Sequence, residues 1–185
     1  MRPHPAAAHR SRVLLLVVAL LVALIAAPGA RAQTRVYSPA FTVDGAVDAP
    51  RSYTLADLQA LPAQEVSVEF MSGNARERHV YRGPLLVDLL TAAKPMFDAT
   101  RRNDSLQWYV TVEATDDYRA VVAWGEIDPG FEGKKVLVAY EADGSPLADV
   151  DGMARLVVPG DARGGRYVSQ IRSIVVRPAG AAIGK

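Results

Sequence analysis

The N-terminal 32 residues most constrain what this chain can fold into, because they have the features of an export signal rather than of a folded domain. Arg2, Arg10 and Arg12 precede a 15-residue apolar run, Val13 to Ala27, and Ala30-Arg31-Ala32 offers the small residues at which a signal peptidase cuts. Such a run is shorter than the roughly 20 apolar residues that span a bilayer, which favours cleavage over a retained membrane anchor. We therefore predict a cleaved signal peptide over 1–32 and a periplasmic mature protein.

The remaining segment, residues 33–185, is predicted to fold as a single domain. Its 153 residues are enough to bury a core, and no linker-like stretch divides them. Removing the signal takes away four of the 21 Lys and Arg residues and none of the 20 Asp and Glu residues, so the mature net charge is −3. A nucleic-acid binder normally has a strong basic excess, so no nucleic-acid partner is expected.

The chain has no cysteine, which restricts both its stability and its chemistry. An exported protein without cysteine has no disulfides, so its core alone must stabilise it. A cysteine nucleophile, an iron–sulfur cluster and any cysteine-ligated metal are excluded. His79 is the one histidine after the signal, and it follows the charged run Arg76-Glu77-Arg78, which indicates a solvated loop residue and not a zinc ligand or triad member.

The hydrophobic pattern predicts an α+β fold with a strand-rich core and short helices near the start. Thr54 is the expected N-cap of a helix that ends at Pro62, and Pro84 begins a second helix with an apolar face over 85–90. Residues 72–79 are expected to form a loop. Strands are expected at 37–47, 65–71, 106–114, 119–124, 135–140, 155–158 and 173–176.

A glycine-rich segment with arginines follows one of these strands. Leu156-Val157-Val158 leads into Pro159-Gly160 and then into Arg163-Gly164-Gly165-Arg166-Tyr167. Glycines let backbone N–H groups approach a ligand closely, and a guanidinium matches planar or anionic acceptors. A plain hairpin turn with solvated arginines fits the same residues, and the segment by itself does not decide between the two readings.

Five segments occur in the same order as in the molybdopterin-binding domain of sulfite-oxidase-type oxidoreductases, which this chain resembles over essentially its whole mature length. The resemblance implies the α+β sulfite-oxidase-type molybdopterin-binding fold. The segments are 43–62, Met71-Ser72-Gly73-Asn74, Gly83-Pro84-Leu85-Leu86, Asp116-Asp117-Tyr118, and 139–147 followed by Gly152, Arg155 and Val158-Pro159-Gly160.

Two departures from that family bear on function. Met71 stands at the position that resembles the molybdenum-ligating cysteine of the molybdenum enzymes. A thioether is a neutral, weak donor and does not replace an anionic sulfur. Val168-Ser169-Gln170 replaces a Val-Lys-Trp signature, so the lysine that would neutralise a cofactor phosphate is missing, and Arg163 or Arg166 would have to substitute. Molybdenum cofactor is therefore not expected, and enzymatic activity is left undecided, with the Met71 position arguing against it.

The chain resembles instead a branch of small exported proteins of this fold that bind a reduced pterin without metal. That resemblance implies a sensor whose partner is the periplasmic region of a membrane protein that controls cyclic-di-GMP turnover. It also implies a monomer, because the dimerisation domain of the larger enzymes has no counterpart here. Two other hypotheses stay open: a molybdopterin-dependent oxidoreductase subunit with atypical ligation, and an interaction module without ligand.

The chemistry of a pterin selects the candidate ligand-binding residues. A flat ring edged with donors and acceptors needs a stacking surface, a group for its aminopyrimidine edge and donors for its carbonyl oxygen. The candidates are Tyr118 or Trp124 for stacking, Asn74, Asp116 or Asp117 for the edge, Arg155 for the carbonyl, Met71 as a floor, and the loop residues Arg163, Arg166 and Tyr167.

Most of these candidates also have a purely structural interpretation. Asp116-Asp117 is a good turn signal, Trp124 and Met71 fit a core, and Asn74 fits a left-handed turn. Arg155 is harder to explain in this way, because a charge at the start of an apolar strand needs a partner or a ligand. No pair of residues suggests a general acid and base, so no catalytic residue is predicted.

Overall fold

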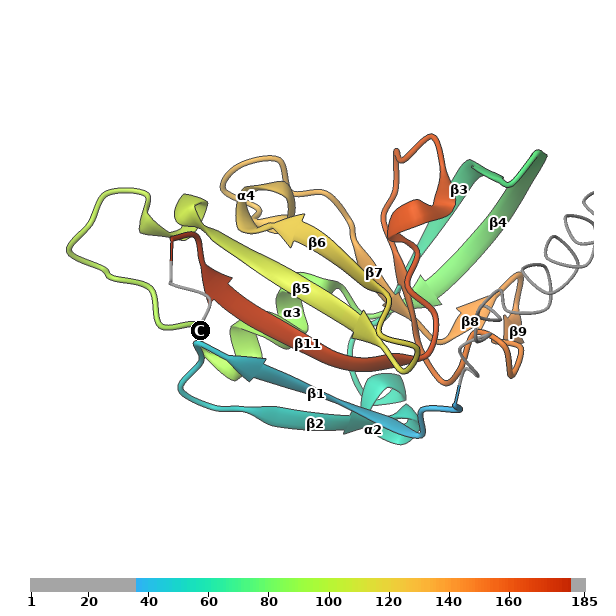
Figure 1. The fold of residues 1–185 in the computed structure, drawn as a ribbon, viewed down its shortest axis with the longest axis horizontal. Coiled ribbons are helices and arrows are strands. Elements are labelled where there is room, and N and C mark those ends of the chain that lie inside the picture. The colour runs from blue at the N-terminus through green and yellow to red at the C-terminus, as the bar shows by residue number, and fades with distance from the viewer. Residues whose placement is uncertain (1–35, 181–185) are drawn as a thin grey trace, which may run out of the picture. The chain divides into compact units, whose positions relative to one another are not determined.

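The computed structural model describes residues 36–180, so the predicted signal peptide lies outside the described residues (Figure 1). The helices and 3₁₀ turns are short and the strands dominate, as the sequence predicts. The helical elements are α2 (Leu55–Gln59), α3 (Leu86–Ala93), η1 (Asp104–Gln107), α4 (Trp124–Ile127) and η2 (Gly164–Arg166). The strands are β1 (Ala40–Gly45), β2 (Arg51–Thr54), β3 (Gln64–Ser72), β4 (Ala75–Gly83), β5 (Trp108–Ala114), β6 (Arg119–Ala123), β7 (Leu137–Ala139), β8 (Glu141–Ala142), β9 (Ser145–Pro146), β10 (Arg155–Val157) and β11 (Ile171–Pro178).

A five-stranded sheet, in the order β2-β1-β11-β5-β6, forms the main layer (Figure 1). The pair β1 and β11 is parallel, and the other neighbours are antiparallel. The helix after β2 begins as predicted, since Thr54 and Asp57 form a reciprocal capping box in which each side chain accepts from the other residue's backbone N–H. Strand β2 itself was not anticipated from the sequence.

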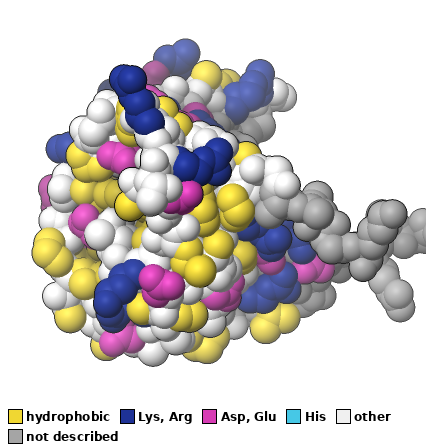
Figure 2. All heavy atoms as spheres, turned by 90° about the vertical axis from the view of Figure 1, so that its left-hand side faces the viewer, with side chains coloured by type: hydrophobic (Ala, Val, Ile, Leu, Met, Phe, Trp, Pro, Cys, Tyr) yellow, Lys and Arg dark blue, Asp and Glu magenta, His cyan; other side chains and the backbone are white. Residues whose placement is uncertain are grey.

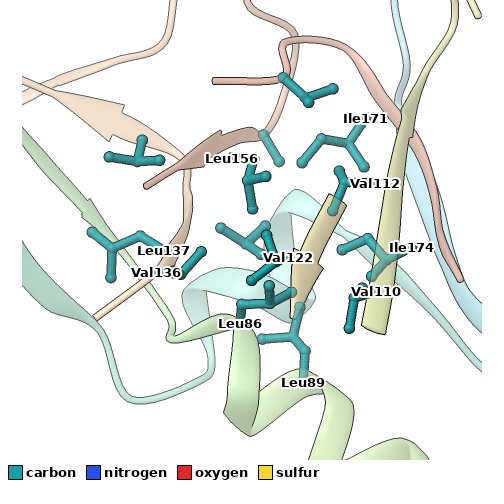
Figure 3. Close-up of a cluster of buried hydrophobic side chains, with 14 of the residues drawn as sticks. Leu86, Leu89, Val110, Val112, Val122, Val136, Leu137, Leu156, Ile171 and Ile174 are labelled. Atoms are coloured by element: carbon teal, nitrogen blue, oxygen red, sulfur yellow. The ribbon is translucent and has the colours of Figure 1, made fainter. Parts of the chain in front are cut away.

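Helix α3 packs against this sheet and closes the core. Its buried residues are Leu86, Leu89, Leu90 and Ala93, the face expected from their spacing. Figure 3 shows Leu86 and Leu89 pointing toward strand residues that include Val110. All three side chains are fully buried, and burial of each Leu or Val side chain stabilises the fold by roughly 1.5–3 kcal/mol.

A second sheet, β3-β4-β8-β9, corrects one prediction from the sequence. Residues 75–79, expected in a loop, belong to β4, which pairs with β3 along its whole length around a two-residue turn at Gly73 and Asn74. The charged run misled the prediction because Arg76 and Arg78 both lie on the exposed face, where they form ion pairs with Glu69 of β3. His79 is likewise a strand residue, whose Nδ1 lies 2.7 Å from Asp143 Oδ2.

Strands β7 and β10 form a short pair that connects the two larger sheets, and the register of this pair sets the position of the first residue of β10. Arg155 lies opposite Ala139 in the ladder, and Leu137 also bridges to Leu85 before α3. At Gly83 the chain needs glycine, because a Cβ would lie 2.3 Å from the Val138 carbonyl oxygen. This close approach holds the end of β4 against β7, the strand that pairs with β10.

The described surface carries charges of both signs. On the face drawn in Figure 2, Lys and Arg side chains are interspersed with Asp and Glu side chains and with apolar ones. Among residues 36–180, no helix is both long and apolar enough to cross a membrane.

Candidate ligand-binding cleft

A polar cleft of about 260 Å³ lies where the β5–β6 turn, the start of β10 and the loop between β10 and β11 meet. We call this set of residues the cleft. Four of the ten candidate residues line it: Asp116, Tyr118, Arg155 and Tyr167. The other lining residues are Ala114, Asp151, Gly164, Gly165 and Ser169.

Arg155 is the central cation of the cleft, and its side chain is only 18% exposed. Its Nη1 donates to Asp151 Oδ1 at 2.9 Å. The guanidinium carbon lies 5.8 Å from the ring centroid of Tyr81 and 5.9 Å from that of Tyr167, so two aromatic faces help to hold the charge. Its Nε, however, is buried and has no hydrogen-bond partner among residues 36–180.

Tyr167 carries a second buried polar atom without a described partner, its hydroxyl oxygen. The residue is 5% exposed, and its ring packs 4.4 Å from that of Phe70. Burial, together with the nearby Asp161 carboxylate, raises the pKa of Tyr167 to about 12, so the hydroxyl keeps its proton at any physiological pH. An unsatisfied buried polar group costs roughly 1–3 kcal/mol, which calls for an explanation in a native fold.

Asp151 and Ser169 belong to the cleft but were not predicted from the sequence. Ser169 Oγ donates to Asp151 Oδ1 at 2.8 Å, so this oxygen accepts from both Ser169 and Arg155. The sequence signal was weak, because Asp151 sits in an Asp-Val-Asp-Gly stretch that is also typical of a turn. The one indication in the sequence that Asp151 could pair with Arg155 was their spacing of four residues.

The β5–β6 turn places its three candidate residues differently. Tyr118 is half-exposed and its hydroxyl donates to the Gly165 carbonyl, which fixes the ring at the edge of the cleft. Asp116 also lines the cleft and accepts from the Tyr118 N–H at 3.2 Å. Asp117 has a left-handed backbone with φ of 64°, and its side chain pairs with Arg172 at 3.1 Å, outside the lining residues.

Arg166 is held by two carboxylates and does not line the cleft. Its Nε and Nη2 donate to both oxygens of Asp161 at 2.8 and 2.6 Å, and its Nη1 donates to both oxygens of Glu126 at 3.2 and 3.0 Å. These hydrogen bonds, from Asp161 first, raise the pKa of Arg166. We call Arg166, Asp161, Glu126 and Lys134, whose Nζ lies 3.3 Å from Glu126, the arginine clamp.

Three other candidates lie along the β3–β4 hairpin rather than in the cleft. Met71 is half-buried, its N–H donates to the Ala162 carbonyl at 3.0 Å, and it forms a parallel bridge with Arg163. Arg163 is exposed, and no described residue forms an ion pair with it. Asn74 is exposed at the hairpin turn. Met71 therefore lines a separate surface hollow with Phe70 and Ala162.

Trp124 is placed in the core and not beside the cleft. It is 4% exposed, its Nε1 donates to Asp128 Oδ2 at 3.0 Å, and its ring meets Phe97 edge to face at a centroid distance of 4.7 Å. Of the two stacking candidates, only Tyr118 faces the cleft. The sequence could not separate them, because both are aromatic residues at the ends of β6.

The cleft is lined by hydrogen-bonding side chains and, among the described residues, by no sulfur-bearing side chain. Asp151 brings a carboxylate to the cleft, and Arg155 and Tyr167 each carry a buried polar atom without a partner among the described residues. Molybdenum of the sulfite-oxidase type needs a thiolate, and the chain contains no cysteine. Within residues 36–180, no group of three or more His, Asp or Glu side chains is arranged to hold a metal ion.

Comparisons with known proteins agree with this architecture. The family described as "oxidoreductase molybdopterin binding domain" matches residues 33–181. The fold is similar to the sulfane dehydrogenase SoxCD from Paracoccus pantotrophus, with a TM-score of 0.61 and 19% identity over 78% of this chain. That similarity covers 40% of the SoxCD chain, so the present chain spans well under two thirds of it. No curated protein matches the chain. The predicted α+β fold of the sulfite-oxidase type is confirmed.

Proposed function

The chain belongs to the oxidoreductase molybdopterin-binding domain family, and from this premise we propose that it is an exported protein that binds a reduced pterin without molybdenum. We propose further that it relays the presence of the pterin to the periplasmic region of a membrane signalling protein that controls cyclic-di-GMP turnover. The family supplies the pterin-related class of ligand, and the residues of the cleft carry the rest of the proposal.

The observation that carries the proposal is the pair of buried donors beside a carboxylate. Arg155 Nε and the Tyr167 hydroxyl have no partner among residues 36–180, although both residues line the cleft. Native proteins rarely leave such groups unsatisfied, and those that remain commonly bond to water or a ligand. A pterin carbonyl or ring nitrogen is an acceptor of the kind these donors need.

The metal-free part of the proposal depends on the sulfur chemistry of the chain. Without cysteine, the chain cannot supply a thiolate, and the thioether of Met71 is a weak neutral donor. Met71 also lies on β3, where its backbone pairs with the 162–163 segment, and it is not among the lining residues of the cleft. The described residues that line the cleft therefore include no sulfur-bearing side chain.

The relay part of the proposal depends on a loop shared by two regions. Gly164 and Gly165 line the cleft, and the adjacent Ala162 and Arg163 pair with Met71 at the end of β3 (Figure 1). Gly164 packs so closely on the Phe70 ring that a Cβ there would lie 2.9 Å from it. A ligand that orders this loop would therefore also order the end of the charged β3–β4 hairpin, which lies at the surface.

Ligand analysis of the mature protein tests the binding proposal. The protein would be purified under anaerobic conditions from its native periplasm, denatured, and analysed by mass spectrometry and by elemental analysis for molybdenum. A released pterin with no molybdenum is the expected result. Stoichiometric molybdenum would overturn the metal-free assignment. Release of neither, together with no binding of added tetrahydropterin in calorimetry, would favour the interaction module without ligand.

Hydrogen–deuterium exchange tests the relay separately. Addition of tetrahydropterin is expected to slow exchange at the amides of the 161–167 loop and at Met71, whose N–H bonds to this loop. Amides of β1, which β11 and β5 separate from β6 in the five-stranded sheet, serve as the internal control. Protection confined to the cleft, with Met71 unchanged, would contradict the coupling between cleft and hairpin.

A further inference from the structure

We propose that Asp151 selects the ligand by accepting two adjacent N–H donors from the 2-amino-4-oxo edge of its ring. This inference rests on the proposed function and names the residue that decides which heterocycle the cleft accepts. The recognised chemistry is a ring N–H next to an exocyclic amino group, which pterins and guanine share. A carboxylate suits this pair because its oxygens only accept when ionised.

The two carboxylate oxygens of Asp151 differ in their hydrogen-bond partners. Oδ1 accepts from Arg155 Nη1 at 2.9 Å and from Ser169 Oγ at 2.8 Å. Oδ2 accepts no hydrogen bond from any residue within 36–180, while the side chain stays 21% exposed at the wall of the cleft. The first oxygen positions the carboxylate, and the second remains available to a ligand.

The neighbouring acidic side chains do not offer the same arrangement. Asp117 is 63% exposed, pairs with Arg172 and does not line the cleft. Asp161 has both oxygens bonded to Arg166, as part of the arginine clamp. Asp116 lines the cleft, but its Oδ1 accepts the Tyr118 N–H, as is usual for an aspartate in a turn. Asp117, which does not line the cleft, is therefore the matched control for Asp151.

Asp151 and Arg155 together are complementary to the order of groups along a pterin edge. That edge presents the amino group, the ring N–H and then the carbonyl oxygen, which is two donors followed by an acceptor. The open Oδ2 of Asp151 accepts the two donors, and Arg155 Nη2, which donates to no residue within 36–180 and is not among the buried unpaired atoms, donates to the carbonyl. Since Asp151 and Arg155 are already an ion pair, a neutral ring adds hydrogen bonds without leaving a charge uncompensated.

Exchange of one ring substituent tests the inference. Calorimetry would compare tetrahydropterin with the equally reduced 2,4-dioxo pteridine, in which an oxygen acceptor replaces the amino donor. The wild-type protein is expected to prefer the 2-amino ring by about 10- to 100-fold, the range for one hydrogen bond to a charged group. Asp151→Asn is expected to lose most of this preference, because its amide can donate to the 2-oxo group. Asp117→Asn should keep it.

The possible outcomes separate the inference from the proposed function. A wild-type protein that binds both rings equally overturns the inference without the use of any variant, as does an Asp151→Asn protein that folds and keeps the wild-type preference. A wild-type protein that binds neither ring overturns the proposed function itself. Guanosine is the third ligand: binding as tight as that of tetrahydropterin, and equally sensitive to Asp151→Asn, would keep the role of Asp151 and identify the ligand as a purine.

Discussion

Arg155 and Arg166 are both mostly buried arginines near the same loop, yet their surroundings differ. Every donor-bearing nitrogen of Arg166 bonds to Asp161 or Glu126 within the arginine clamp. Arg155 donates to Asp151 through Nη1 and forms cation–π contacts with two tyrosine rings. Its Nε is buried and has no partner among residues 36–180. One guanidinium is satisfied by the protein alone, and the other is not.

This difference teaches how to separate structural from ligand-binding arginines in one segment. A bidentate guanidinium with two partly buried carboxylates stabilises the fold, and removing it strands those carboxylates. A guanidinium that leaves a donor unsatisfied beside a cleft is the better candidate for ligand binding, because native folds seldom leave such a donor without a partner. The contrast between Arg155 and Arg166 can be tested through ligand affinity, stability and the pH dependence of stability.

The largest expected effect is the loss of ligand affinity in Arg155→Ala. Removing the donor to the ring carbonyl and the partner of Asp151 should weaken tetrahydropterin binding about 100-fold, or roughly 2.7 kcal/mol. Unfolding free energy should also fall, by about 1–2 kcal/mol, because the substitution leaves the mostly buried Asp151 carboxylate without its cation but with its Ser169 bond. Calorimetry and urea unfolding measure the two quantities. A variant that binds normally would end the assignment of Arg155.

Arg166→Ala should keep its ligand affinity and lose more stability than Arg155→Ala, because it removes the partner of two carboxylates instead of one. The substitution leaves the carboxylates of Asp161 and Glu126 unpaired, and we expect the unfolding free energy to fall by about 2–3 kcal/mol, less than for a fully buried pair. Affinity for tetrahydropterin, measured at a temperature where the variant is folded, should stay within about threefold. A strong loss of affinity with unchanged stability would erase the contrast between the two arginines.

Tyr167→Phe sharpens the contrast by deleting a single unsatisfied hydroxyl. Without ligand, the variant should be as stable as the wild type or more stable by up to about 1 kcal/mol, since a buried polar group without a partner is removed. Affinity for tetrahydropterin should fall by a few-fold, on the order of one hydrogen bond. Thermal unfolding with and without ligand measures both effects. A clear destabilisation of the free protein would mean that the hydroxyl is already satisfied.

The smallest effect is the acid sensitivity of the arginine clamp. Burial raises the pKa of Glu126, but the Ala123 N–H and Arg166 outweigh it, so the net pKa lies below its ordinary value of 4.5. Because the folded pKa is the lower one, this carboxylate contributes its full stability above pH of about 4.5 and loses it as pH falls through the folded pKa. The slope is at most about 1.4 kcal/mol per pH unit for one proton.

Glu126→Gln isolates that contribution, since Gln keeps an acceptor for the Ala123 N–H but does not titrate. The difference in unfolding free energy between wild type and variant should shrink as pH is lowered below 4.5. A difference that is constant from pH 7 to pH 3 would show that Glu126 does not couple to Arg166 as the geometry indicates.

The strands and caps that depend on neighbouring residues were largely predictable. The Thr54 cap, the apolar face of α3 and the strands around Val110 and Ile174 follow from short-range patterns. Strand β4 was missed because its charged run was interpreted as a loop, whereas its exposed arginines form ion pairs with Glu69 on the predicted neighbouring strand β3. Alternation of charge can mark the solvated face of a hairpin as readily as a loop.

The cleft was predicted in part, and its errors share one cause. Of the segment from Arg155 to Tyr167, four residues line the cleft, namely Arg155, Gly164, Gly165 and Tyr167, whereas Arg166 is held by Glu126, 40 residues away in the sequence. Trp124 lies in the core, although it was also a candidate for stacking on a ligand. Asp151 lines the cleft, although its sequence context is typical of a turn. Each of these placements depends on which distant element packs alongside.

The sequence by itself determined the family resemblance, the local elements and the absence of any thiolate, because these depend on residue identity and on neighbours within one or two turns of chain. The tertiary structure decided which polar groups are satisfied. Hydrogen-bond partners are selected by distances of about 3 Å between atoms that are far apart in the chain, and such distances are set only when the sheets and loops have packed.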